Sequence, residues 1–273
     1  MPFATNPRDG AAIRYEVDAD GADGEAVVVC GDVGLGVWQF GWQHAALAGP
    51  HTVLTPETRG VGESDAPPGP YAVATLAADI EAVCAAEGVR DAHLVGYGLG
   101  GMVALTAALA SARPSSLAVL GTPPAGDAFD PAGGWADPTD PDAVEESLCG
   151  LLSPEFREAH PDACSQIAAW RLAEDADRET YETHRAAVEG FDVADRLHEL
   201  TTPTLVVHGG DDGVCPATAG ETLAAGPPRG EVHRGRGARH LVGAGGPAAV
   251  HDLRAGWAAD HAAVAVAGPR AAG

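Results

Sequence analysis

The chain has 273 residues, which is enough for one large α/β domain with a sizeable buried core. It carries 39 Asp and Glu residues against 16 basic residues, all of them arginine, so its formal net charge is −23. A chain this acidic repels the phosphate backbone, and no apolar run is long enough to span a membrane, so we expect neither nucleic acid nor a membrane as a partner.

The amino-terminal residues and the cysteines lead to further expectations. Residues 1–10 lack the charged and then apolar pattern of a signal peptide, so we expect a cytoplasmic protein. The five cysteines form no C-x-x-C pair, and the histidines show no metal-ligand spacing. We therefore expect no metal and no cofactor, and we interpret the cysteines as reduced thiols.

Short apolar runs alternate with helical patterns along the chain. In chain order, the sequence predicts a strand at 27–30, a helix at 37–47, a strand at 52–54, a helix at 75–87, a strand at 92–96, a helix at 99–112, strands at 117–121 and 204–208, and a helix at 248–266. This alternation is typical of βαβ units. The expected fold class is α/β, with a mostly parallel, doubly wound sheet and helices on both faces.

One segment interrupts the alternation. Residues 123–190 are rich in Pro, Gly, Asp and Glu, with helical patterns at 143–152 and 163–172. A segment of this size with few apolar clusters would be marginally stable as a separate domain. We interpret it as a helical cap inserted into a core domain made of residues 1–122 and 191–273.

Four short segments carry the residues that chemistry could use. They are Cys30-Gly31-Asp32, the run R-G-V-G-E-S-D at 59–65, the turn G-Y-G-L-G-G at 96–101, and G-G-D-D at 209–212, which His240 follows 28 residues after Asp212. The order and spacing of these segments resemble the α/β-hydrolase superfamily over about residues 11–260. The resemblance implies that family's fold, with His240 as the catalytic base and Asp212 as the group that orients it.

The chain departs from the family at the nucleophile elbow, which usually reads G-x-S-x-G. Here the nucleophile position is Gly98, and the elbow holds no Ser, Asp or Cys that could replace the missing side chain. The elbow imposes an unfavourable backbone angle, which costs a non-glycine residue about 1–3 kcal/mol and which glycine adopts freely. Serine acyl transfer therefore cannot proceed from this position.

His240 and Asp212 still fill the base and acid positions. Such a pair can activate a water molecule or take a proton from a substrate without any covalent step. Two alternatives stay open. The pair is a relic, or Asp211 and Asp212 only cap the helix that follows.

The resemblance places Gly31, Asp32 and Leu99 in the oxyanion region. The family usually has His-Gly where this chain has Cys30-Gly31, and Asp32 falls where a backbone N–H would face the oxyanion. A carboxylate there is unfavourable unless it points away. Asp32 is either a second acid/base group or a turn residue that bonds its own backbone, and we favour the turn residue. We interpret Cys30 as a packing thiol rather than a replacement nucleophile.

The turn also matches a dinucleotide fingerprint, because Gly96, Gly98 and Gly101 form G-x-G-x-x-G between a predicted strand and helix. No acidic residue that could hold a ribose ends the next predicted strand, so we rank this interpretation below the hydrolase resemblance. Trp38 and Tyr97 are candidates to line an apolar pocket for a small uncharged ligand, and core packing is the alternative.

The sequence thus predicts a member of the α/β-hydrolase superfamily that acts on a small ester, lactone or similar carbonyl compound through the Asp212–His240 dyad and water. A catalytically inactive, ligand-binding protein on the same scaffold is the main alternative, and a dinucleotide-binding protein is a weaker one. The expected partner is a small molecule, and association into a homo-oligomer stays open.

The net charge of −23 leads to a prediction about salt. Self-repulsion destabilises the compact state unless salt screens it, so we expect the free energy of unfolding to be higher in molar KCl than in dilute buffer. Urea titrations in both solvents measure the difference, because urea itself carries no charge. Equal stability in the two solvents would contradict adaptation to high salt.

Overall fold

The computed structural model describes residues 2–19, 25–41, 44, 47 and 51–243. The predicted helix at 248–266 and most of the second half of the predicted helix at 37–47 lie outside these residues. The first half of the predicted helix at 37–47 is a short 3₁₀ helix, η1 (Val37–Phe40). No helix within the described part of the chain has the length and apolar character that a membrane crossing requires.

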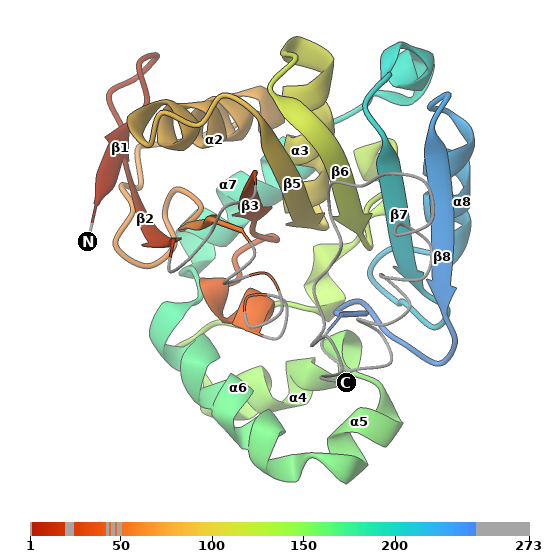
Figure 1. Cartoon of the computed structure of the whole chain (residues 1–273). Helices are drawn as coiled ribbons and strands as arrows, with labels where there is room; N and C mark the ends of the chain where they lie inside the picture. Colours follow the sequence, from red (N-terminus) through yellow and green to blue (C-terminus); the bar gives the residue numbers. More distant parts are fainter. Residues whose placement is uncertain (1, 20–24, 42–43, 45–46, 48–50, 244–273) are drawn as a thin grey trace, which may run out of the picture.

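An eight-stranded sheet with the order β1-β2-β4-β3-β5-β6-β7-β8 forms the centre of the molecule (Figure 1). Strand β2 runs antiparallel to both of its neighbours, and the other pairs are parallel. The predicted α/β class with a mostly parallel sheet is therefore confirmed. The strands are β1 (Phe3–Thr5), β2 (Ala12–Asp18), β3 (Ala26–Cys30), β4 (Val53–Pro56), β5 (Ala92–Tyr97), β6 (Pro114–Leu120), β7 (Thr204–Gly209) and β8 (Gly230–Gly235).

The five predicted strands correspond to β3, β4, β5, β6 and β7. All residues of β3, β5 and β7 are buried, which is why these strands read as continuous apolar runs. Strand β8 is different, because it lies at the edge of the sheet and has no buried residue. A strand with this composition leaves no apolar pattern, and the sequence analysis missed it together with β1 and β2.

The helices connect the strands and fill the segment between β6 and β7. They are α2 (Val73–Ala86), α3 (Leu99–Ala110), α4 (Pro141–Leu151), α5 (Pro154–Ala159), α6 (Pro161–Glu174), α7 (Arg178–Glu189) and α8 (Ala217–Ala225), with short 3₁₀ helices η2 (Gly126–Ala128), η3 (Pro131–Gly133) and η4 (Ala194–Glu199). Asp140 and Ser153 each cap a helix by accepting a hydrogen bond from a backbone N–H of its first turn, and each is followed by a proline at the first helical position.

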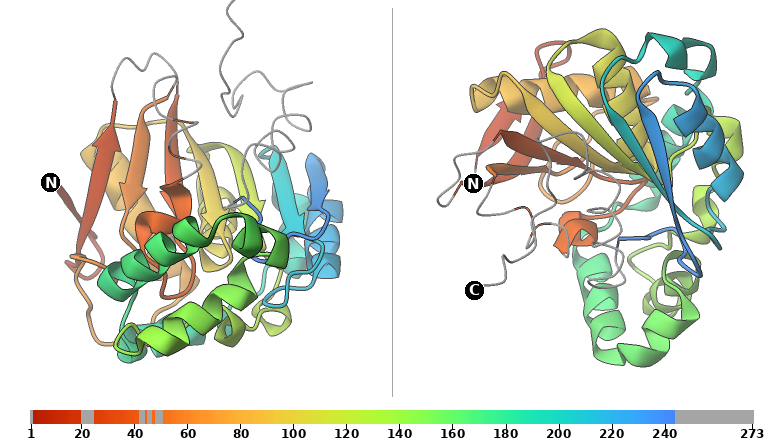
Figure 2. Two further views of the ribbon diagram at one scale, coloured as in Figure 1. Left: turned by 90° about the horizontal axis from the view of Figure 1, so that it is seen from below. Right: turned by 45° about the vertical axis from the view of Figure 1, so that its right-hand side comes forward.

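Helices α4, α5 and α6 lie together beyond the carboxyl ends of the parallel strands, apart from the helices that flank the sheet (Figures 1 and 2). They come from the segment 123–190 that interrupts the predicted strand and helix alternation. Several contacts join this segment to the loop after β3. The Asp175 carboxylate, for example, accepts hydrogen bonds from the Gly36 N–H at 2.9 Å and from Trp38 Nε1 at 2.7 Å.

A buried ion pair holds the loop at 59–65 against α2. The Arg59 guanidinium is 1% exposed and donates through Nε and Nη2 to the two carboxylate oxygens of Asp79 at 2.7 and 2.6 Å. Its Nη1 donates to Asp9 at 2.8 Å, and Asn6 donates to Asp79 at 2.6 Å. Through this bidentate pair Arg59 holds the loop at 59–65 in place.

The contrast between buried and exposed ion pairs is testable. We expect Asp79→Ala to lower the free energy of unfolding by about 3–5 kcal/mol, because it leaves the Arg59 guanidinium buried without its main partner. Glu199→Ala removes the exposed partner of Arg196, and we expect it to cost less than about 1 kcal/mol. Chemical denaturation at constant salt measures both, and equal effects would contradict the assigned role.

Candidate functional site

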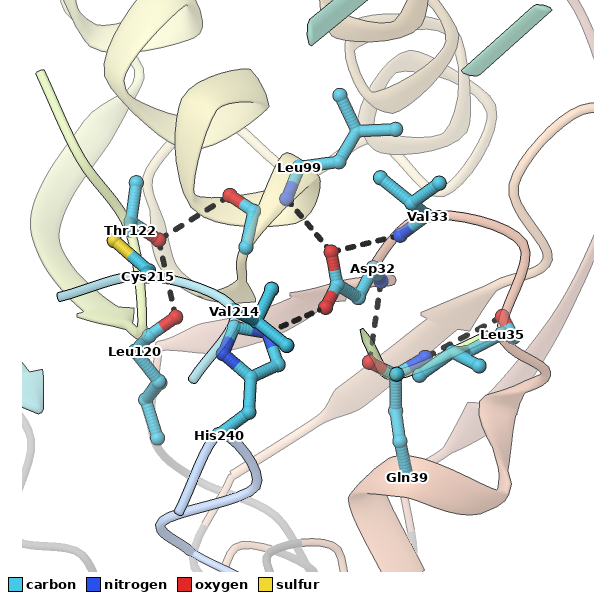
Figure 3. A network of polar contacts seen from close by, with 12 residues as sticks. Asp32, Val33, Leu35, Gln39, Leu99, Leu120, Thr122, Val214, Cys215 and His240 are labelled. Atoms are coloured by element: carbon cyan, nitrogen blue, oxygen red, sulfur yellow. Dashed lines mark hydrogen bonds and ion pairs between the residues drawn. The ribbon is translucent and has the colours of Figure 1, made fainter. Parts of the chain in front are cut away.

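Four segments meet at the carboxyl ends of the central strands. Asp32 follows β3, Gly98 lies between β5 and α3, Asp212 follows β7, and His240 lies in the loop after β8. Figure 3 shows the Asp32 carboxylate pointing toward both the first turn of α3 and the His240 ring. Residues that are far apart in the sequence thus form one buried polar cluster.

The turn at Gly98 has the sharp backbone expected for a nucleophile elbow. Gly98 has a φ of 46° and a ψ of −109°, and its N–H donates to the Leu120 carbonyl at 2.9 Å. The neighbouring glycines are needed for close approach, since a Cβ on Gly100 would overlap the Cys30 carbonyl oxygen and one on Gly101 would overlap Thr122 Oγ1. The strand, turn and helix therefore pack with no room for larger residues.

Asp212 contacts His240 and is itself held by the backbone. Its Oδ1 accepts hydrogen bonds from the N–H groups of Val214 at 2.8 Å and Cys215 at 3.0 Å. Its Oδ2 lies 2.9 Å from Nδ1 of His240. Asp212 therefore fixes the turn at 212–215 and also contacts the histidine. It does not cap the helix that follows, as one alternative held, because the N-cap of α8 is Pro216 and no side chain caps this helix.

The Asp32 carboxylate connects His240 to the oxyanion region. Its Oδ1 accepts hydrogen bonds from the Leu99 N–H at 2.9 Å and the Val33 N–H at 2.7 Å. Its Oδ2 lies 2.8 Å from Nε2 of His240. Asp32 therefore bonds the backbone of its own turn, as the favoured interpretation expected, and its carboxylate also contacts the candidate base.

The carboxylate of Asp32 fills the space that a side chain at position 98 would need. A Cβ built on Gly98 would overlap Asp32 Oδ1 and would lie 2.7 Å from Oδ2. The loss of the nucleophile and the presence of Asp32 are therefore sterically coupled. A side chain at position 98 and the observed Asp32 conformation exclude one another.

Two carboxylates keep the His240 ring charged. Burial by itself would lower the pKa of His240, but the charges and hydrogen bonds of Asp212 and Asp32 outweigh it and raise this pKa to about 10. Burial likewise works to raise the pKa of Asp212, while the nearby His240 charge holds it below its ordinary value. At neutral pH the site is an imidazolium between two aspartates, with the edge of Phe129 packed against the ring at a centroid distance of 5.6 Å.

The remaining predicted site residues lie in or beside the core. Tyr97 is fully buried against Phe40, and its hydroxyl accepts a hydrogen bond from the Gly243 N–H at 3.0 Å. Trp38 is also buried, and its Nε1 donates a hydrogen bond to Asp175 of the helical segment. Gly31 lies beneath Thr58, whose Oγ1 would be 3.0 Å from a Cβ at this position. Burial raises the pKa of the Cys30 thiol, which keeps the sulfur protonated and unreactive.

The sequence analysis missed His184 of α7. Its Nδ1 accepts a hydrogen bond from the Gly34 N–H at 3.1 Å, and its Nε2 donates to the Arg59 carbonyl at 3.0 Å. Burial lowers its pKa to about 4, so the ring is neutral and can accept at one nitrogen and donate at the other. His184 thereby ties the loop after β3 to the Arg59 loop. A single histidine in a helix gives no sequence signal for such a role.

The geometry of the described residues gives little support to a metal ion or a dinucleotide as a ligand. Within the described ranges, no group of three or more His, Cys, Asp or Glu side chains is arranged to hold a metal ion. The N–H of Leu99 at the start of α3, which a dinucleotide phosphate would use, already binds the Asp32 carboxylate.

Comparisons with known proteins agree with the fold. A family model described as "Alpha/beta hydrolase family" matches residues 27–266. The chain is 34% identical over 232 residues to a protein of Variovorax paradoxus (strain S110) named "Putative carbamate hydrolase RutD", which covers 78% of this chain and 84% of that protein.

Solved structures extend the similarity. A hydrolase from Pseudomonas aeruginosa PA01 has a TM-score of 0.80 at 27% identity, covering 93% of this chain and 97% of that one. The enol-lactonase from Burkholderia xenovorans LB400 shares the fold, with a TM-score of 0.75 at 21% identity over 89% of this chain and 94% of that one.

The steric coupling of Gly98 and Asp32 predicts a double-mutant cycle. We expect Gly98→Ser alone to lower the free energy of unfolding by about 2–4 kcal/mol, through the positive φ and the overlap with the Asp32 carboxylate. In the Asp32→Gly background the overlap is gone, and we expect the same substitution to cost at least about 1 kcal/mol less. Denaturant titration of the four proteins gives the coupling. Strictly additive effects would show that the two residues do not compete for one space.

Proposed function

This chain belongs to the alpha/beta hydrolase family, and on that premise we propose that it hydrolyses a small carbonyl compound with water, rather than a side chain at the elbow, as the nucleophile. The observation that carries the proposal is the intact Asp212–His240 contact beside an elbow without a nucleophile. This contact lies at the carboxyl ends of the central strands, which is where sheets of this class bind their ligands.

The substrate class follows from the scaffold and its relatives. Esters and lactones are expected from the family resemblance, and the name of the Variovorax relative adds carbamates. All of these compounds present a carbonyl carbon that water attacks, and all release an oxygen or nitrogen leaving group. We propose this shared carbonyl chemistry, with no cofactor, as the activity of the chain.

His240 supplies the proton transfer in this proposal. Asp212 accepts the Nδ1–H, so Nε2 is the nitrogen that faces the reaction side. The partner of Nε2 is the Asp32 carboxylate at 2.8 Å, and protons therefore enter and leave through the Asp32–His240 pair. No acyl-enzyme forms on the elbow, because Gly98 has no side chain.

A binding protein without catalysis is the second candidate, and one observation favours it. The N–H groups of Leu99 and Val33, which a substrate oxyanion would use, already hold the Asp32 carboxylate. In that case the site would hold a small ligand and release it unchanged. The cytoplasmic location and the cap role of residues 123–190 remain predictions under either candidate.

The two candidates differ in turnover. We expect the protein in molar KCl to hydrolyse members of a panel of small alkyl esters, lactones and alkyl carbamates, and His240→Gln to lower kcat on these compounds at least about 100-fold. His93→Gln is the matched control, because His93 is a buried histidine in β5 outside the site. Full activity of His240→Gln would contradict the proposal. A silent wild-type protein that is nevertheless stabilised by panel compounds in thermal unfolding would support the binding candidate.

A further inference from the structure

The loop after β3 is built to hold a carboxylate at one place. The Asp32 N–H donates to Gln39 Oε1 at 3.1 Å, and Gln39 is fully buried, with its Nε2 bonded to the Gly36 carbonyl at 2.8 Å. The Oδ1 of Asp32 lies at the amino-terminal end of α3, where the helix dipole favours a negative charge. Figure 3 shows this network around Asp32. Hydrogen bonds of the loop and of α3 therefore hold the Asp32 carboxylate in place, and the residue is buried rather than exposed on the surface.

This carboxylate occupies space that a side chain at the nucleophile position would need. A Cβ on Gly98 would overlap Asp32, and Asp32 Oδ2, rather than a hydroxyl at the elbow, contacts the Nε2 of His240. A hydroxyl needs a base to remove its proton before it can react. A carboxylate is already ionised at neutral pH and can itself accept a proton.

The two carboxylate oxygens of Asp32 have different hydrogen-bond partners. Oδ1 is held by the N–H groups of Leu99 and Val33, while Oδ2 contacts only the His240 ring among the hydrogen bonds of the described residues. A carboxylate oxygen can accept two hydrogen bonds, so Oδ2 keeps one free lone pair for a water molecule. The backbone thus leaves Oδ2 as the oxygen of Asp32 that can accept a further hydrogen bond.

His240 has the opposite capacity. Asp32 and Asp212 lie against its two ring nitrogens at 2.8 and 2.9 Å and hold it as an imidazolium. A charged ring has no lone pair with which to remove a proton from water, but it can donate a proton from Nε2. The base of a Ser-His-Asp triad is therefore the acid of this site.

We infer that Asp32 is the general base that activates water and that His240 is the general acid that protonates the leaving group. The inference rests on the proposed carbonyl hydrolysis and assigns its two proton transfers. It also narrows the substrate class to carbonyl compounds whose leaving group needs a proton, namely alkyl esters, lactones and carbamates that release an alkoxide or an amine.

The site supplies and recovers every proton that the reaction uses, and no group is oxidised or reduced. The water oxygen bonds to the carbonyl carbon while one water proton passes to Asp32 Oδ2. The bond to the leaving group then breaks, its electron pair stays on the leaving oxygen or nitrogen, and that atom takes the Nε2 proton of His240. Asp32 finally returns its proton to Nε2 across the 2.8 Å contact, which restores the starting state.

Attack by Asp32 itself on the carbonyl carbon is the competing role. It would form a mixed anhydride, which is less stable than the ester or carbamate from which it arises. Isotope labelling separates the two roles, because hydrolysis of such an anhydride by labelled water can leave heavy oxygen in Asp32, whereas a general base gains none.

The test compares two esters of one acyl group in molar KCl. The ethyl ester releases an alkoxide that needs a proton, and the 4-nitrophenyl ester releases a stable phenolate. We expect Asp32→Asn to lower kcat at least about 100-fold on both esters. We expect His240→Gln to lose at least about 100-fold on the ethyl ester and less than about 10-fold on the 4-nitrophenyl ester. Glu199→Gln is the control, because it removes an exposed carboxylate of η4 outside the site.

Circular dichroism confirms that each variant is folded, and turnover of the wild-type protein in H₂¹⁸O is followed by mass analysis of the peptide that contains Asp32. We expect no heavy oxygen in Asp32. Label in Asp32, full activity of Asp32→Asn, or equal losses of His240→Gln on both esters would overturn the inference while leaving the hydrolytic function in place. A wild-type protein that hydrolyses neither these esters nor the wider panel would overturn the proposed function, and this inference with it.

Discussion

The space beside the α-carbon of Gly98 holds one functional group, and in this protein the Asp32 carboxylate occupies it. Because position 98 has no side chain, the loop after β3 can bring a carboxylate against the start of α3 and against His240 at once. The chemistry of the site depends on this exchange. In the inferred mechanism a carboxylate takes the place of the elbow hydroxyl, and the neighbouring histidine acts as an acid rather than as a base.

The charge balance explains how such a site can be buried. One imidazolium lies between two carboxylates, and the excess negative charge is met by backbone N–H groups at both ends, from Leu99 and Val33 on Asp32 and from Val214 and Cys215 on Asp212. Buried charges are tolerated when they are paired and fully hydrogen-bonded. The same physical rule governs the Arg59–Asp79 pair, which holds a loop and performs no chemistry. Pairing alone therefore does not identify a functional site. The Asp32–His240–Asp212 cluster differs from the Arg59–Asp79 pair because it lies at the carboxyl ends of the central strands.

The surrounding structure keeps the loop after β3 in position. His184 is neutral and bonds the Gly34 N–H from α7, and Asp175 bonds the Gly36 N–H from the end of α6. Both contacts come from the helical segment between β6 and β7. The segment that departs from the strand and helix alternation is thus coupled mechanically to the loop that carries Asp32. Any movement of these helices would therefore displace the loop that carries Asp32.

The sequence by itself determined the central strands and the sharp turn. Strands β3, β5 and β7 are buried throughout and read as apolar runs, and the glycines at 98, 100 and 101 mark a turn that no larger residue fits. It did not reveal β8, because an exposed edge strand has no apolar pattern. Only the tertiary structure decided the role of Asp32. Its partners Leu99 and His240 lie 67 and 208 residues away along the chain, and hydrogen bonds at such separations depend on how loops approach one another rather than on any local pattern.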